Sequence, residues 1–302
     1  MTVSEPQFVI RGILPALLTP FKDGGVDIAM LRKLVRFQLD QGCHGFFVNG
    51  STGDGFLMTR EERKSVVEAV VSEVAGQGKV IAHVGAVSSD EAAAMAMDAR
   101  KAGADAVASV PPIYYPVDLE GFELHMRTIA EAADMPTYCY YIPSLTGHAL
   151  GGDQFVEVAE RIPNLVGFKY THSDMFLLWW ILDALGERIS VFNGSDQMLL
   201  QGLITGACGG IGSTYNYQTR TIVDVYEALE AGDLDKAREA QWRANKVVQV
   251  LFRFKGGGVA VERAILRLMG YEVGPPRPPK VPFPDEKLPA LRNALEEIGF
   301  LQ

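Results

Sequence analysis

Short apolar segments alternate with longer amphipathic segments through the first two thirds of the chain. The apolar segments have no polar face, as expected of strands that are buried on both sides in a parallel sheet. The amphipathic segments carry apolar residues at helical spacing. We predict strands at 12–18, 45–48, 79–84, 104–110, 136–141, 165–169, 189–193 and 207–211, with helices between them that include 28–41, 60–75, 90–101, 119–133 and 155–161.

Eight such strands, separated by single helices, favour a closed barrel over an open doubly wound sheet. An open sheet that binds a dinucleotide carries a Gly-x-Gly-x-x-Gly turn after its first strand. The segment 12–18 is followed by Thr19-Pro20-Phe21 instead. We therefore expect an α/β fold, a (β/α)₈ TIM barrel.

The pattern changes after residue 218, where only helices are predicted, at 221–231, 234–254, 259–269 and about 286–298. The triplet Gly256-Gly257-Gly258 separates the second of these helices from the third. A proline-rich stretch at 274–280 resembles an SH3-type ligand, but beside a terminal helix such a stretch is more often a stiff surface segment. We predict a catalytic barrel core at 1–218 and a C-terminal helical extension at 219–302, packed on the barrel.

Composition and charge narrow the possible partners. The chain has 302 residues, is 48% hydrophobic and carries a net charge of −9, which describes a globular protein and disfavours nucleic acid and anionic membrane surfaces as partners. The longest apolar run, 176–182, is too short to span a bilayer, and the first residues lack the basic start and apolar stretch of a signal peptide. Cys43, Cys139 and Cys208 are odd in number and widely spaced, which predicts reduced thiols in a cytoplasmic protein. The five histidines form no helical pair, so we expect no metal site.

A single lysine ends the apolar run Asn164-Leu165-Val166-Gly167-Phe168-Lys169. At the carboxyl end of a buried strand, desolvation disfavours the charged ammonium and makes a neutral amine available. A neutral amine is the nucleophile that Schiff-base chemistry on a carbonyl substrate requires. Taken alone, the residue leaves open a solvated lysine at the end of an ordinary strand.

The active site of such a barrel lies at the carboxyl ends of its strands. Ser51 and Thr52 follow one strand in a glycine-rich turn, whose hydroxyls and backbone amides suit a small carboxylate, although turn geometry alone could explain the glycines. Tyr140 and Tyr141 end another strand, and strand alternation places one ring inside and one outside. A hydroxyl beside a Schiff-base lysine would relay protons, and simple packing is the alternative.

Four motifs occur in order along the chain: Gly50-Ser51-Thr52-Gly53-Asp54, Tyr140-Tyr141-Ile142-Pro143, Gly167-Phe168-Lys169 and Gly210-Ile211-Gly212-Ser213-Thr214-Tyr215-Asn216. Together they resemble the class I pyruvate aldolase superfamily, the group of dihydrodipicolinate synthase and N-acetylneuraminate lyase. The resemblance covers roughly residues 10–300. Dihydrodipicolinate synthases typically carry an arginine two residues after the proline of the tyrosine motif, where this chain has Leu145, so the chain looks most like the N-acetylneuraminate lyases.

The resemblance assigns roles residue by residue. It implies that Lys169 is the Schiff-base nucleophile, that Tyr140 is the proton-relaying hydroxyl, and that Tyr114 reaches a neighbouring active site across the tight dimer of a homotetramer. Ser51 and Thr52 are implied to hold the pyruvate carboxylate. The residues expected to meet the hydroxylated tail of the substrate are Thr171, Gly194, Asp196, Gln197 and Ser213.

The expected reaction is the reversible cleavage of a 2-keto-3-deoxy sugar acid, with N-acetylneuraminate giving N-acetylmannosamine and pyruvate. No cofactor is expected, because the lysine itself supplies the iminium that accepts electrons. Two positions depart from the pattern: Asp54 and Gln197 both stand where glutamate is usual, and the second change bears on the exact sugar. The alternatives are a 2-keto-3-deoxy-gluconate-type aldolase, a dehydratase or a deaminase of the same superfamily, then dihydrodipicolinate synthase. A catalytically silent barrel that acts as a binder is the alternative from another class.

Overall fold

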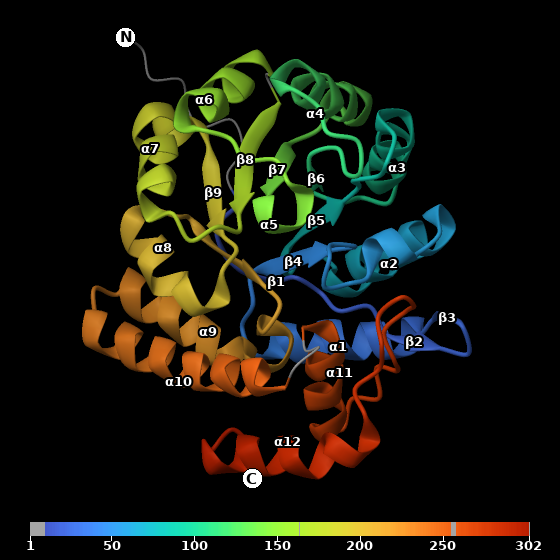
Figure 1. Cartoon of the computed structure of the whole chain (residues 1–302), viewed down its shortest axis with the longest axis vertical. Coiled ribbons are helices and arrows are strands. Elements are labelled where there is room, and N and C mark those ends of the chain that lie inside the picture. The colour runs from blue at the N-terminus through green and yellow to red at the C-terminus, as the bar shows by residue number, and fades with distance from the viewer. Residues whose placement is uncertain (1–9, 163, 255–257, 302) are drawn as a thin grey trace.

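The computed structural model describes residues 10–162, 164–254 and 258–301 (Figure 1). Eight parallel strands form one sheet in the order β1-β10-β9-β8-β7-β6-β5-β4. This is the (β/α)₈ TIM barrel that the hydrophobic pattern predicts. The strands are β1 Gly12–Pro15, β4 Gly45–Val48, β5 Lys79–His83, β6 Ala106–Ser109, β7 Thr137–Tyr141, β8 Leu165–Tyr170, β9 Ser190–Asn193 and β10 Gly209–Gly212. A small antiparallel hairpin pairs β2 Phe21–Lys22 with β3 Gly25–Val26.

Backbone hydrogen bonds close the ring between the first and last strands of the sheet. The Leu17 N–H donates to the Phe47 carbonyl at 2.9 Å, and the His44 N–H donates to the Ile13 carbonyl at 2.8 Å. Residues 16 and 17, which the sequence assigns to the first strand, lie beyond β1, where Ala16 bridges to Phe47 of β4. The chain thus changes its pairing partner from β10 to β4 just after β1, where the barrel closes.

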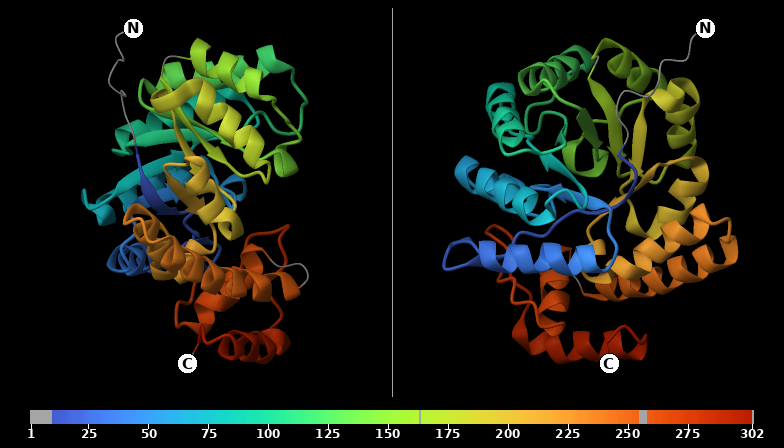
Figure 2. Two further views of the ribbon diagram at one scale, coloured as in Figure 1. Left: turned by 90° about the vertical axis from the view of Figure 1, so that its left-hand side faces the viewer. Right: turned by 180° about the vertical axis from the view of Figure 1, so that it is seen from behind.

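Helices surround the sheet and extend the molecule at one end (Figures 1 and 2). They are α1 Ile28–Asp40, α2 Arg60–Val74, α3 Ser89–Lys101, α4 Leu119–Ala133, α5 Pro143–Thr146, α6 Gly152–Arg161, α7 Met175–Leu185, α8 Leu199–Thr205, α9 Tyr215–Glu230, α10 Leu234–Arg253, α11 Val259–Leu268 and α12 Leu288–Glu297. Short 3₁₀ turns occupy Gly55–Leu57, Gly186–Arg188, Asp196–Met198 and Asp285–Lys287. Among the described residues, no helix combines the length and the apolar character needed to cross a membrane.

Helix starts follow local capping chemistry, which is why the sequence predicts them well. Asp27, Ser88 and Asp118 each accept a hydrogen bond from a backbone N–H in the first turn of the helix that follows. Thr59 and Glu62 form a reciprocal capping box at the start of α2.

The predicted domain boundary after residue 218 falls inside α9, where the helix is kinked at Gln218. The sequence also predicts a break between helices at Gly256-Gly257-Gly258. Residues 256 and 257 of this triplet lie outside the described residues.

Inward and outward positions alternate along the strands. Leu14, Phe47, Ile81 and Phe192 belong to the cluster inside the barrel, whereas their strand neighbours pack between sheet and helices. A bulge interrupts the pairing of β8 with β7, so that Gly167 lies opposite Tyr138. A Cβ on Gly167 would lie 2.3 Å from the Tyr138 ring, so the glycine leaves the space that this ring fills.

A buried ionic cluster attaches the C-terminal extension to the barrel. Asp54, in the loop after β4, accepts hydrogen bonds from Arg263 of α11 at 3.1 Å and from Lys280. The side chain of Asp54 is 0% exposed and that of Arg263 is 3% exposed. Arg263 also donates to the carbonyl of Thr19 at 2.8 Å. The loop after β4 and the C-terminal segment therefore share one charge network.

We expect Asp54→Asn to lower the free energy of unfolding by about 3–5 kcal/mol, because it leaves the Arg263 guanidinium buried without its counter-charge. Chemical denaturation followed by circular dichroism measures the loss. Asp285→Asn is the matched control, since Asp285 pairs with Arg267 at 2.6 Å on the surface and its loss should change the midpoint little. Equal midpoints for wild type and Asp54→Asn would contradict the role of the cluster.

Candidate active site

Lys169 lies at the carboxyl end of β8, directed into the barrel. The residue is 4% exposed, and its backbone is paired with Tyr140 of β7 and Phe192 of β9. Its Nζ lies 3.9 Å from the centre of the Tyr140 ring and 4.5 Å from the centre of the Phe47 ring. No carboxylate of the described residues forms an ion pair with it. The amine is thus enclosed by aromatic rings and is not held in a salt bridge.

Tyr140 and Tyr141 point to opposite faces of β7. Tyr140 lies inside the barrel and is 4% exposed, with the His83 ring edge-on at 6.0 Å between centroids. Tyr141 lies outside, where it stacks on Tyr170 and its hydroxyl accepts from the Leu150 N–H at 3.3 Å. Strand alternation predicted one ring inside and one outside, and the structure places the Tyr140 ring beside the lysine.

His83 is a neutral neighbour of this aromatic group. Burial, followed by the positive charges of Arg63 and Lys169, lowers the pKa of His83 well below its usual range. Its Nε2 accepts a hydrogen bond from the Val110 N–H at 3.3 Å. The interior beside Lys169 therefore holds a neutral imidazole.

Ser51 and Thr52 lie in the loop after β4, where backbone contacts leave no room for side chains at two glycines. A Cβ on Gly55 would approach the Asn49 carbonyl oxygen to 1.9 Å, and one on Gly53 would approach the Leu17 carbonyl oxygen to 2.8 Å. Ser51 and Thr52 line a cavity of about 360 Å³. The other residues that line it are Leu145, Ser213, Gly258, Val259, Ala260, Glu262, Lys280 and Val281.

Thr171 and Gly194 follow β8 and β9 and lie against each other. A Cβ on Gly194 would lie 2.0 Å from Thr171 Oγ1, so only glycine fits there. Thr171 Oγ1 is buried and has no hydrogen-bond partner among the described residues. The predicted contact of Thr171 with the substrate tail stays a prediction.

Asp196 is buried against the end of β10, while its neighbour Gln197 is exposed. Burial raises the pKa of Asp196, and the Thr214 N–H, which donates to its Oδ2 at 2.7 Å, opposes that rise. A Cβ on Gly212 would lie 2.0 Å from Asp196 Oδ1. The chain thus packs the carboxylate tightly onto this strand end.

Ser213 donates a hydrogen bond of 2.6 Å to Oε1 of Glu262, a residue that sequence reasoning missed. Glu262 is 2% exposed, and burial raises its pKa to about 7. A sequence feature that could have pointed to Glu262 is the run Val-Ala-Val-Glu-Arg-Ala-Ile-Leu at 259–266, in which two charged residues interrupt an apolar helix. The charge of Arg263 is paired with that of Asp54, whereas Glu262 lines the cavity.

Tyr114 does not join these residues within one chain. It is 87% exposed and its backbone has a positive φ of 75°. Its ring lies edge-on to that of Tyr115 at 5.0 Å. Its predicted role across a dimer stays a prediction.

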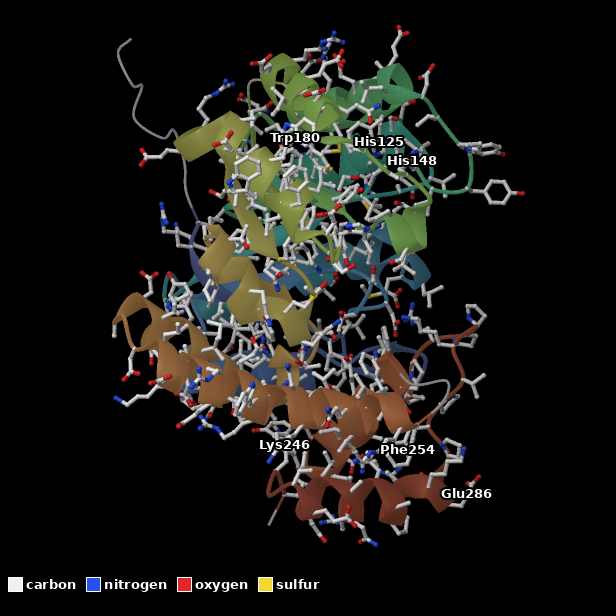
Figure 3. The ribbon with its side chains drawn as sticks, turned by 60° about the vertical axis from the view of Figure 1, so that its left-hand side comes forward. His125, His148, Trp180, Lys246, Phe254 and Glu286 are labelled. Carbon is white, nitrogen blue, oxygen red and sulfur yellow. The ribbon has the colours of Figure 1, made fainter. Side chains whose placement is uncertain are left out.

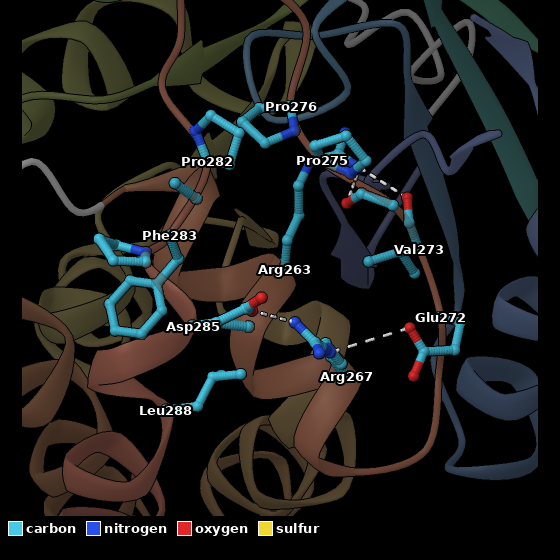
Figure 4. Close-up of a pocket in the computed structure, with 14 residues that line it drawn as sticks. Arg263, Arg267, Glu272, Val273, Pro275, Pro276, Pro282, Phe283, Asp285 and Leu288 are labelled. Carbon is cyan, nitrogen blue, oxygen red and sulfur yellow. Dashed lines mark hydrogen bonds and ion pairs between the residues drawn. The ribbon is translucent and has the colours of Figure 1, made fainter. Parts of the chain in front are cut away.

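A larger cavity of about 550 Å³ lies in the C-terminal extension (Figure 4). Its charged side chains are paired, Arg267 with Asp285 at 2.6 Å and with Glu272 at 4.0 Å. None of the candidate site residues lines it. Within the described ranges no group of three or more potential ligands could hold a metal ion. We therefore place the candidate active site at the strand ends around Lys169.

Comparison with known proteins identifies the family. The model of the dihydrodipicolinate synthetase family matches residues 9–298. N-acetylneuraminate lyases of Citrobacter koseri and Escherichia coli are 38% and 37% identical to the chain, over 96% of its length and 97% of theirs.

Solved structures of sialic acid aldolases and dihydrodipicolinate synthases are also similar to this chain. The sialic acid aldolase of Ruminococcus gnavus, solved as wild type and as a catalytic lysine mutant, superimposes with a TM-score of 0.91 at 30% identity, and the wild-type match covers 95% of this chain and 96% of that one. Dihydrodipicolinate synthase of Aquifex aeolicus gives 0.90 at 31% identity, covering 96% and 98% of the two chains. The chain belongs to the dihydrodipicolinate synthetase family.

Proposed function

We propose that this protein is a Schiff-base aldolase that cleaves N-acetylneuraminate to N-acetylmannosamine and pyruvate. The observation that carries the proposal is Lys169, a buried amine without an ion-pair partner among the described residues, enclosed by Tyr140 and Phe47 at a strand end. A lysine amine that is not held in an ion pair is the nucleophile that Schiff-base chemistry on a carbonyl uses. The choice of N-acetylneuraminate as the substrate is supported by the relatives named N-acetylneuraminate lyase, which are 37–38% identical to this chain.

The reaction starts with addition of Lys169 Nζ to the C2 carbonyl of the open-chain substrate. Loss of water gives a protonated imine, whose positive nitrogen withdraws electrons from C3. Ser51 and Thr52 hold the carboxylate at C1. Both residues follow β4 and line a cavity at the same end of the barrel as Lys169, and the role that we assign to them is to position C2 at the amine.

Cleavage then breaks the C3–C4 bond. The C4 hydroxyl loses its proton to the relay that includes Tyr140 and the substrate carboxylate, C4 becomes the aldehyde carbonyl, and the bonding pair forms the enamine. The relay returns a proton to C3, and water hydrolyses the imine to release pyruvate and the free lysine. No cofactor enters the balance.

Leu145 separates this activity from that of dihydrodipicolinate synthase. Its side chain lines the cavity and cannot bind a second substrate carboxylate, as an arginine at this position would. Thr171, Gly194, Asp196, Gln197 and Ser213 are the residues that we assign to the hydroxylated tail. The site is therefore suited to a sugar acid rather than to a dicarboxylate.

We also propose a homotetramer of tight dimers located in the cytoplasm. Tyr114 and Tyr115 are 87% and 64% exposed, which supports a tight-dimer contact. Helix α7 presents Phe176 and Trp179, 64% and 48% exposed, beside Trp180 (Figure 3), which supports a second contact. The cysteines Cys43, Cys139 and Cys208 are free and buried, as is usual in a reducing compartment.

Borohydride with pyruvate should inactivate the protein and attach a reduced pyruvate to Lys169. Lys169→Ala should abolish the label, and pyruvate release from N-acetylneuraminate should fall to background. Mass mapping of the adduct and a coupled pyruvate assay make the two measurements. Lys79→Ala is the control, because Lys79 pairs with Asp105 at 2.7 Å at the opposite end of its strand. An adduct on another lysine, or none, would sink the proposal.

Tyr140→Phe should lower kcat by roughly a hundredfold or more, the scale for losing a positioned acid–base group. Tyr141→Phe is the matched control, because its hydroxyl is bonded to Leu150 outside the barrel, and its kcat should change little. Steady-state kinetics on both variants give the comparison. Equal losses in the two variants would remove the special role of Tyr140.

Replacing Phe176 and Trp179 together by Glu should convert the tetramer to a dimer, since charges would then face each other across the contact. Sedimentation velocity measures the change. Trp242→Glu on α10 is the control, because Trp242 is 62% exposed but lies on another helix. A monomeric, fully active wild type would contradict both proposed contacts.

A further inference from the structure

Glu262 places a carboxylate where an apolar residue would fit the helix better. It lies in α11 between Val261 and Arg263, and its helix neighbours pack into the core. Its Oε1 accepts the Ser213 hydroxyl at 2.6 Å, but its Oε2 is buried and has no partner among the described residues. An unpaired buried carboxylate oxygen is costly, so Oε2 keeps the capacity to accept a hydrogen bond from a ligand group.

The bond to Glu262 fixes what Ser213 can offer to a ligand. A serine hydroxyl has one proton and two lone pairs. Because the proton points to Glu262, Ser213 presents lone pairs and can accept, but not donate, a further hydrogen bond. A ligand hydroxyl fits this position, whereas a carbonyl or carboxylate oxygen does not.

Ser213 and Glu262 line the same cavity of about 360 Å³ as Ser51 and Thr52. Lys280, at the same cavity, is held by Asp54 and by the Ser51 carbonyl at 3.2 Å. The ammonium group of Lys280 is therefore bound to the loop after β4. The carboxylate end and the Ser213–Glu262 end of the cavity thus offer different chemistry to the two ends of one ligand.

We propose that Ser213 and Glu262 form a subsite for hydroxyl groups of the substrate tail, and that Glu262 determines the preference for a polyhydroxylated sugar acid over a short keto acid. The inference rests on the proposed function and adds a residue that the family resemblance did not supply. Oε2 of Glu262 accepts one tail hydroxyl and Ser213 Oγ accepts another. Asp196, in the loop after β9, accepts the Thr214 N–H at Oδ2, and its charge acts on Glu262.

Several charged and titratable groups face Glu262. Burial raises its pKa to about 7, the charge of Asp196 adds to the rise, and those of Lys280 and Arg263 oppose it. Tyr217 of α9, whose own pKa is raised by burial and by Glu262, also faces it. Raising the pH through 7 therefore converts a carboxyl to a carboxylate, which accepts a charge-assisted hydrogen bond. Preference for the hydroxylated substrate should rise over the same interval.

The test compares kcat/KM for two substrates: the sugar acid from which wild type releases pyruvate fastest, and 4-hydroxy-2-oxopentanoate, which lacks the hydroxylated tail. Glu262→Leu should lower the ratio of the two about tenfold or more, because tail hydroxyls lose their acceptor. Glu262→Gln keeps an acceptor for Ser213, so it should retain most of the ratio at pH 6 and lose its rise between pH 6 and 8. Glu286→Leu, exposed near α12 (Figure 3), is the control.

An unchanged ratio in Glu262→Leu, or equal loss on both substrates, would overturn the subsite. If Glu262→Leu fails to fold by circular dichroism, the pH profile of Glu262→Gln decides, and a rise like that of wild type overturns the inference. Borohydride trapping on wild type keeps the two proposals apart. A wild type that forms no pyruvate adduct refutes the aldolase, whereas one that forms it and shows an unchanged ratio in the variants refutes only the subsite.

Discussion

A parallel strand leaves backbone N–H and C=O groups unpaired along an edge unless another strand covers them. In this chain β1 and β4 cover each other's edges, through the bonds from Leu17 to Phe47 and from His44 to Ile13. Ring closure brings the carboxyl ends of eight strands to one face. Each predicted binding residue except Tyr114 follows or ends one of those strands, so the site exists only because the ring closes.

Closure also makes the interior a small apolar space that must still hold a lysine. Gly167 leaves room for the Tyr138 ring below, and Tyr140 and Phe47 lie within 4.5 Å of the Lys169 amine. Aromatic faces attract a cation without supplying a counter-charge. Among the described residues, the Lys169 amine thus has aromatic rings around it and no ion-pair partner, which leaves it available for imine formation.

The C-terminal extension contributes to the site as well as to stability. Its α11 supplies Arg263, which holds the loop of Ser51 and Thr52 through Asp54, and, one residue earlier, Glu262, which orients Ser213. One helix therefore supports both ends of the cavity. Changes in this helix should affect substrate choice even though it lies outside the strand ring.

The sequence by itself determined the elements and their order. Apolar runs on both faces set the eight strands, capping residues such as Thr59 and Asp118 set the helix starts, and alternation separated Tyr140 from Tyr141. These features arise within single segments, where spacing along the chain fixes direction in space. The four family motifs identified the candidate site residues at the strand ends, because each motif also lies within one short segment.

Only the tertiary structure decided which distant side chains meet. Ser213 and Glu262 are 49 residues apart and Asp54 and Arg263 are 209 apart, so no local pattern relates them. The bulge in β8 and the partner change after β1 depend likewise on how neighbouring strands fit into the ring. A buried charge is tolerated only where its partners converge, and their convergence is a property of the closed barrel rather than of any segment.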